Sequence, residues 1–110
     1  MDKSLVYADI LTQILNEECK IQYRTIPGLK KVSACDRASG QFLLVTIGRD
    51  NNKHWIHNIL FHAQLIDGKI IVELDNTEWL SSMLLEAGVS EEDLMSGDER
   101  ERLESIQLAA

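Results

Sequence analysis

The chain has 110 residues, of which 45% are hydrophobic, with one proline and six glycines. This composition is typical of one globular domain, here predicted over residues 1–110 with the tail 98–110 least defined, and it excludes collagen-like and disordered chains. The net charge of −7 opposes direct binding to nucleic acids, and no apolar run or N-terminal leader pattern indicates a membrane or secretory protein, so we expect a cytoplasmic location.

Apolar side chains at spacings of three and four predict a first helix over residues 3–19, capped by Asp2 or Ser4. A breaker at Ile26-Pro27-Gly28 follows, and the hydrophobic period then changes to two. This change predicts an antiparallel meander of four strands. The predicted strands cover residues 31–37, 41–47, 55–66 and 69–74.

The pair Asp67-Gly68 predicts a type I′ turn, because both positions tolerate positive φ. A two-residue turn fixes the register, so a regular ladder places His62 opposite Glu73 on the outer face. The inward face then holds Phe61, Ala63, Leu65, Ile70, Val72 and Leu74, followed by Ile59, His57 and Trp55. The outer face keeps several aliphatic side chains partly unburied, which favours a second layer or a partner subunit. These candidate interface residues are Ile56, Leu60, Ile66 and Ile71.

Two short helices are predicted after the sheet. Asp75 and Glu78 have the spacing of a capping box, and Gly88 is placed as the C-terminal cap of the helix that follows. A further short helix is expected to start at Ser90 and to end at Gly97. The predicted fold class is therefore α+β: an N-terminal helix, a four-stranded antiparallel meander sheet, and two short C-terminal helices.

His62 facing Glu73 is the candidate acid–base pair, since a carboxylate orients an imidazole and raises its pKa. A structural cross-strand hydrogen bond has the same pattern and is the commoner case. His54, His57 and His62 cannot converge within one regular strand, and Cys19 and Cys35 lack metal-ligand spacing. We therefore expect free thiols, no metal and no cofactor.

A compact basic loop runs from Arg49 to His54 and includes Lys53. It is a candidate contact for phosphate or for an acidic partner, and the alternative is a solvated hairpin tip. Residues 86–110 carry eight acidic and two basic residues, which indicates either a solvated segment or one that docks on a basic partner.

Several of these features occur together, in this order, in one family. The segment from His62 to Val72, Thr77-Glu78, the run Glu86-Ala87-Gly88-Val89, Glu92-Asp93 and Gly97 resemble the XisI family, and Asp36, Phe42, Leu44 and Gly48 also fit. These are small cyanobacterial proteins named as controlling factors for excision of the fdxN element. The chain departs from the family pattern at Arg49 and Ile71, where tryptophan is usual, and at Asp98-Glu99-Arg100, where a Phe-His-Pro-Pro segment is usual.

The resemblance implies a non-catalytic accessory role in programmed DNA excision, beside a companion excision protein and a recombinase complex. It implies action through protein–protein contacts, and we expect a homodimer. Two alternatives stay open: a small enzyme that uses His62 and Glu73, and direct DNA binding through the loop from Arg49 to His54.

Overall fold

The computed structural model describes residues 2–109, with side chains through residue 106. The elements are α1 (Lys3–Cys19), β1 (Leu29–Asp36), β2 (Gln41–Arg49), β3 (Trp55–Ile66), β4 (Lys69–Asp75), α2 (Leu80–Glu86), the 3-10 turn η1 (Glu91–Asp93), β5 (Leu94–Ser96) and α3 (Gly97–Ala109). The α+β class, the first helix and the four antiparallel strands are confirmed. The sheet has five strands in the order β1-β2-β3-β4-β5, and β5 runs parallel to β4.

The end of the chain differs from the prediction. The acidic run after Ser90 forms a single 3-10 turn, and the chain then pairs with β4 as β5. Parallel pairing satisfies backbone groups along the edge of β4, which a short isolated helix would leave open. Gly97 begins α3 instead of ending a helix, so the predicted helix from Ser90 to Gly97 is wrong.

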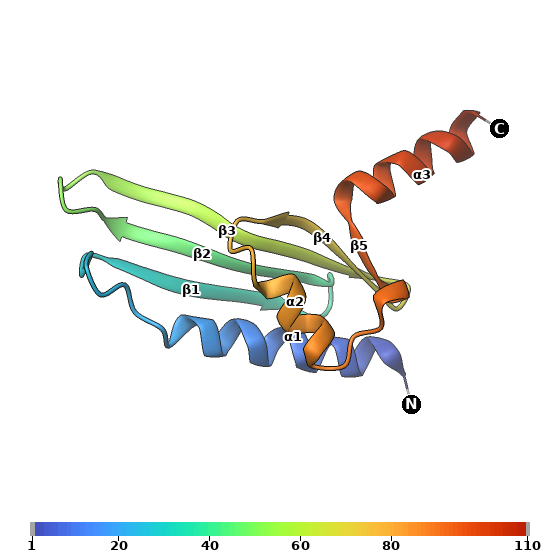
Figure 1. Ribbon diagram of the computed structural model, residues 1–110, viewed down its shortest axis with the longest axis horizontal. Helices are drawn as coiled ribbons and strands as arrows, with labels where there is room; N and C mark the ends of the chain where they lie inside the picture. Colours follow the sequence, from blue (N-terminus) through green and yellow to red (C-terminus); the bar gives the residue numbers. More distant parts are fainter. Residues whose placement is uncertain (1, 110) are drawn as a thin grey trace.

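Helices α1 and α2 cover the same face of the sheet (Figure 1). The apolar stripe of α1 packs on that inner face, where Phe42, Leu44 and Phe61 are at most 1% exposed. Burying each of these side chains contributes about 1.5–3 kcal/mol relative to exposure. The core therefore lies between this helical layer and one face of the sheet.

Two β-bulges change which side chains face the core. Leu44 pairs with Phe61 and Val45 with Ile59, so Leu60 is an extra residue in β3. A bulge reverses the inward–outward alternation beyond it. Ile59, predicted to face inward with His57 and Trp55, is 41% exposed, whereas Leu60 packs against the core.

The second bulge lies in β4. The turn gives the predicted register as far as Ala63 and Val72, but His62 then pairs with Leu74 and leaves Glu73 as the extra residue. The predicted pairing of His62 with Glu73 is therefore wrong. Leu74, predicted to face inward, is 37% exposed.

The predicted turn at Asp67-Gly68 is confirmed, with φ values of 52° and 74°. The capping box at Asp75 and Glu78 is wrong in its details. The Thr77 hydroxyl accepts hydrogen bonds from the backbone N–H groups of Trp79 and Leu80, and the Asp75 carboxylate accepts from Thr77 and Ser81. Burial raises the pKa of Asp75, but these hydrogen bonds outweigh it and leave that pKa below its ordinary value.

The molecule is elongated, with a Cα radius of gyration of 15.5 Å, whereas about 13 Å is typical of a compact domain of this size. The β2–β3 hairpin extends one end, and α3 leaves the sheet at the other end (Figure 1). No helix among residues 2–109 is both long and apolar enough to cross a membrane.

Candidate functional site: the outer face of the sheet

The face of the sheet opposite α1 and α2 carries two rows of side chains that are aliphatic except for His62. Val32, Val45 and Ile59 are cross-strand neighbours, and Ala34, Leu43, His62 and Leu74 form a second row. The exposed fractions are 41% for Val32, 41% for Ile59 and 37% for Leu74. We call these seven residues the outer face. Because these aliphatic residues are neighbours in the sheet, the outer face is a candidate surface for binding another protein.

The four residues predicted for this interface have different positions. Leu60 packs against the core, and Ile56 is half-buried on the same side of the sheet beyond the bulge. Ile71 is only 5% exposed, between Gln64 and Met95 in the sheet, so the prediction that it stays partly unburied is wrong. Ile66 is 40% exposed beside the turn, and its role as an interface residue stays a prediction.

His62 belongs to a chain of amide hydrogen bonds on the outer face. Its Nε2 lies 2.7 Å from Gln41 Oε1, and Gln41 Nε2 donates to Gln64 Oε1 at 3.0 Å. Glu73 instead pairs with Arg100 at the start of α3, with 2.9 Å between Oε1 and Nη1. The candidate acid–base pair is thus divided between two separate networks.

The basic loop is held mainly by contacts of its own. The Arg49 guanidinium donates to the Lys53 carbonyl oxygen at 2.9 Å and lies over the Trp55 ring, with 5.6 Å to its centroid. His54 Nδ1 lies 3.6 Å from Asp50 Oδ2. These contacts explain how the sequence forms a tight hairpin tip, and its binding role stays a prediction.

A groove of about 360 Å³ lies between β4, β5 and the start of α3. It is lined by polar and acidic side chains that include Glu73, Asp75, Asp98 and Glu99. In the part of the chain that the structure describes, no three His, Cys, Asp or Glu side chains are placed to hold a metal ion. Cys19 and Cys35 are free, and burial raises the pKa of the Cys35 thiol, which lowers its reactivity.

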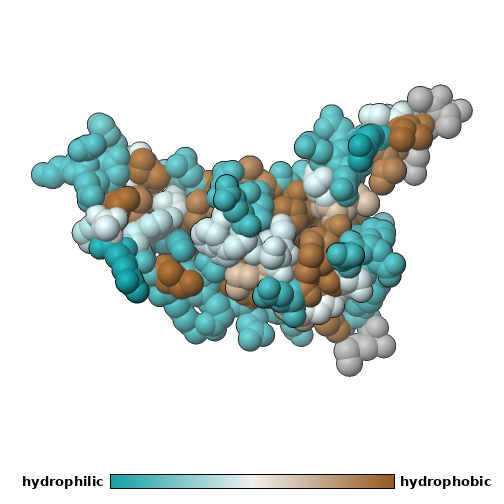
Figure 2. All heavy atoms as spheres, in the orientation of Figure 1, coloured by the Kyte–Doolittle hydropathy of each residue, from teal (hydrophilic) through white to brown (hydrophobic). Residues whose placement is uncertain are grey.

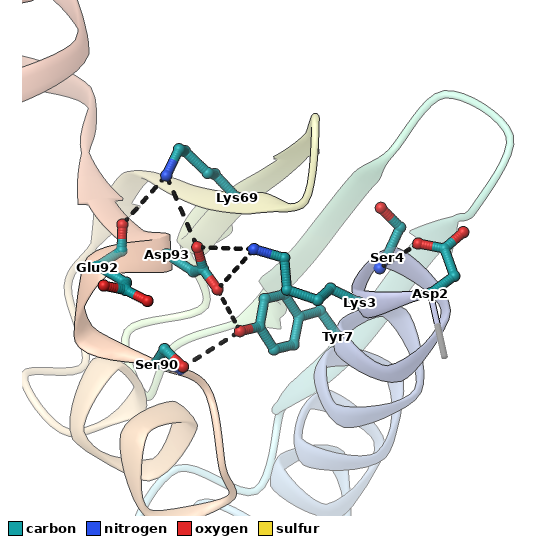
Figure 3. Close-up of polar contacts among 8 residues, drawn as sticks. All are labelled: Asp2, Lys3, Ser4, Tyr7, Lys69, Ser90, Glu92 and Asp93. Carbon is teal, nitrogen blue, oxygen red and sulfur yellow. Dashed lines mark hydrogen bonds and ion pairs between the residues drawn. The ribbon is translucent and has the colours of Figure 1, made fainter.

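A buried polar cluster that the sequence pattern did not predict is centred on Asp93. Asp93 is 3% exposed and accepts a 2.6 Å hydrogen bond from the Tyr7 hydroxyl and two of 3.2 Å from Lys3 Nζ, with Lys69 Nζ 3.7 Å away (Figure 3). The Tyr7 oxygen also accepts from the Ser90 N–H. This Asp93 junction joins α1, the start of β4 and η1. Its members are up to 90 residues apart in the sequence. Tyr7 recurs with the apolar residues of α1, so the sequence pattern marks it only as a core residue.

The Asp93 junction makes stability depend on acidity. The hydrogen bond from Tyr7, aided by Lys3 and Lys69, holds the pKa of Asp93 below its ordinary value despite the opposing effect of burial. Because the pKa is lower in the folded state, the stabilisation is complete above the ordinary carboxyl pKa of about 3.9 and is lost as the pH falls through the folded pKa.

We therefore expect Tyr7→Phe to lower the thermal unfolding midpoint at pH 6 by roughly 5 °C and to do so less at pH 3. The matched control is Tyr23→Phe, whose hydroxyl bonds to the neutral Thr46 side chain. That variant is expected to lose the same amount at both pH values. Equal pH dependence of the two variants in thermal unfolding would contradict the role given to Asp93.

Comparison with known proteins identifies a family. The family model described as XisI protein matches residues 1–107. The fdxN element excision controlling factor XisI from Anabaena variabilis ATCC 29413 has a similar structure, with a TM-score of 0.68 and 23% identity over 86% of this chain and 85% of that one. A XisI-like protein from the same organism has a TM-score of 0.71 and 17% identity, covering 84% of both chains. No curated protein matches significantly.

Proposed function

This chain belongs to the XisI family, and from that premise we propose that it is a non-catalytic accessory protein that controls excision of a DNA element through protein contacts. The Anabaena variabilis protein of similar structure is named an fdxN element excision controlling factor. The expected partners are a companion excision protein and a recombinase complex, and the place of action is the cytoplasm.

The outer face is the observation that carries this proposal. Its exposed aliphatic side chains stand beside a hydrogen-bonded His62, an arrangement suited to a protein interface with an apolar centre and polar groups around it. The alternative of an enzyme using His62 and Glu73 loses support, because these side chains engage Gln41 and Arg100 instead of each other.

The test is an excision reporter in cells that supply the element, its recombinase and the companion protein. We expect excision to depend on this chain, and Ile59→Glu to lower its frequency roughly tenfold or more, because a charge then occupies an apolar contact. Leu5→Glu is the matched control, since Leu5 is 62% exposed on α1 and lies outside the outer face. Its excision frequency is expected to equal that of the unaltered chain.

His62→Ala separates the proposal from catalysis in the same reporter. An accessory role predicts a partial effect at most, whereas an acid–base residue would be essential. Loss of excision in His62→Ala with normal folding, or excision that does not require the chain at all, would contradict the proposed function.

A further inference from the structure

Helix α3 has little packing against the rest of the chain over residues 97–106, the part whose side chains the structure describes. Its first turn is tied to the sheet by the ion pair of Arg100 with Glu73, but residues 101–106 are all exposed. Isolated helices shorter than about 12–15 residues are marginal in water, and α3 has 13 residues. Contacts with another surface would supply the missing stabilisation.

The exposed part of α3 has an apolar stripe. Leu103 and Ile106 are 49% and 60% exposed, and their spacing of three places them on one side of the helix. Figure 2 shows hydrophobic side chains among hydrophilic ones on this projecting helix. The flanking charges are mostly acidic: Asp98, Glu99, Glu101 and Glu104, against Arg100 and Arg102.

The outer face of the sheet complements this helix in charge and in size. On the same face Lys30, Arg49 and His57 border the aliphatic rows toward the β2–β3 hairpin, whereas Asp36 lies at the opposite end of β1, so it is the hairpin end of the face that complements the acidic helix. A 13-residue helix is about 20 Å long, whereas the four strands β1 to β4 span about 14 Å. The helix is therefore long enough to cross the aliphatic rows.

We propose that the chain forms a symmetric dimer in which α3 of each copy packs on the outer face of the other. A two-fold axis makes the contact reciprocal, so each copy contributes both a helix and a sheet face. Leu103 and Ile106 contact the row of Val32, Val45 and Ile59, and the acidic flanks of α3 face the basic border. This proposal deepens the proposed function, since it names the occupant of the same face.

The test is sedimentation equilibrium of the purified full-length chain and two variants. The unaltered chain is expected at twice the 12.5 kDa of one copy. Leu103→Glu keeps helix propensity and Ile59→Glu alters an exposed strand position, and each should weaken self-association at least about tenfold while circular dichroism shows a folded chain. Leu5→Glu, the control on α1, should remain a dimer.

Mixing the two variants distinguishes this arrangement from other dimers. One variant retains an intact sheet face and the other an intact helix, so the mixture can form one of the two contacts and should associate more strongly than either variant alone. A monomeric unaltered chain, variants that remain dimers, or a mixture that behaves as its components would each overturn the proposal.

Measuring excision distinguishes failure of the dimer proposal from failure of the accessory role. A monomeric chain that still supports excision overturns the dimer alone. A dimer that behaves as described but has no effect on excision upholds the dimer and overturns the accessory role.

Discussion

Replacing Gly48 with alanine is expected to cost more than about 4 kcal/mol of stability, a large part of the roughly 5–15 kcal/mol typical of a domain. Gly48 has a φ of +135°, and a Cβ atom there would collide with the backbone carbonyl oxygen of Gly28. Backbone strain accounts for about 1–3 kcal/mol. The collision adds to it, because neither strand can move without breaking the pairing of Leu29 with Gly48.

Gly88→Ala provides the control for strain without collision. Gly88 has a φ of +114°, but no atom lies within 4 Å of the position that an alanine Cβ would occupy. We expect this variant to lose only about 1–3 kcal/mol. Urea unfolding of both variants, with comparable dependence on urea concentration, measures the difference. Equal losses would show that the β1–β2 junction yields more easily than its geometry indicates.

The sequence predicted those features of the fold that depend on neighbouring residues. The period of the first helix, the change to alternating strands and the turn at Asp67-Gly68 each arise within a few positions, and all are confirmed. Gly88 was also placed correctly, since the N–H groups of Gly88 and Val89 bond to carbonyl groups of the last turn of α2.

The bulges could not be read from the same pattern. The chain is apolar at consecutive positions around Leu60, so either set of alternating residues could form the inner face. The pairing with the partner strand determines which set faces inward. Strand β5 has three residues and a partner more than twenty positions away. The predicted faces of Ile56 and Leu60 are therefore wrong, whereas Ile71 lies opposite Gln64 as predicted but is buried.

The Asp93 junction illustrates the same limit for polar groups. Asp93 stands among acids that a helix N-terminus would also favour, and Tyr7 stands on an apolar stripe. Nothing local indicates that the two side chains form a 2.6 Å hydrogen bond. Their contact requires both the packing of α1 on the core and the pairing of β5 with β4.

The bulge at Leu60 can be tested by comparing the loss of unfolding free energy in Phe61→Ala with the loss in Ile59→Ala. A regular strand would place both side chains on one face, and both truncations would then cost several kcal/mol. With the bulge, Phe61 is 1% exposed and Ile59 is 41% exposed. We expect Phe61→Ala to lose about 3–5 kcal/mol through lost burial and a cavity.

Ile59→Ala is expected to lose less than about 1 kcal/mol in the folding of one copy, because solvent already reaches that side chain. Urea unfolding at low protein concentration measures the stability of the single copy separately from any contribution of self-association. Large losses for both variants would restore the regular strand and remove Ile59 from the outer face. The predicted contrast would instead establish that one extra residue in β3 determines which side chains form the core and which are left for a partner.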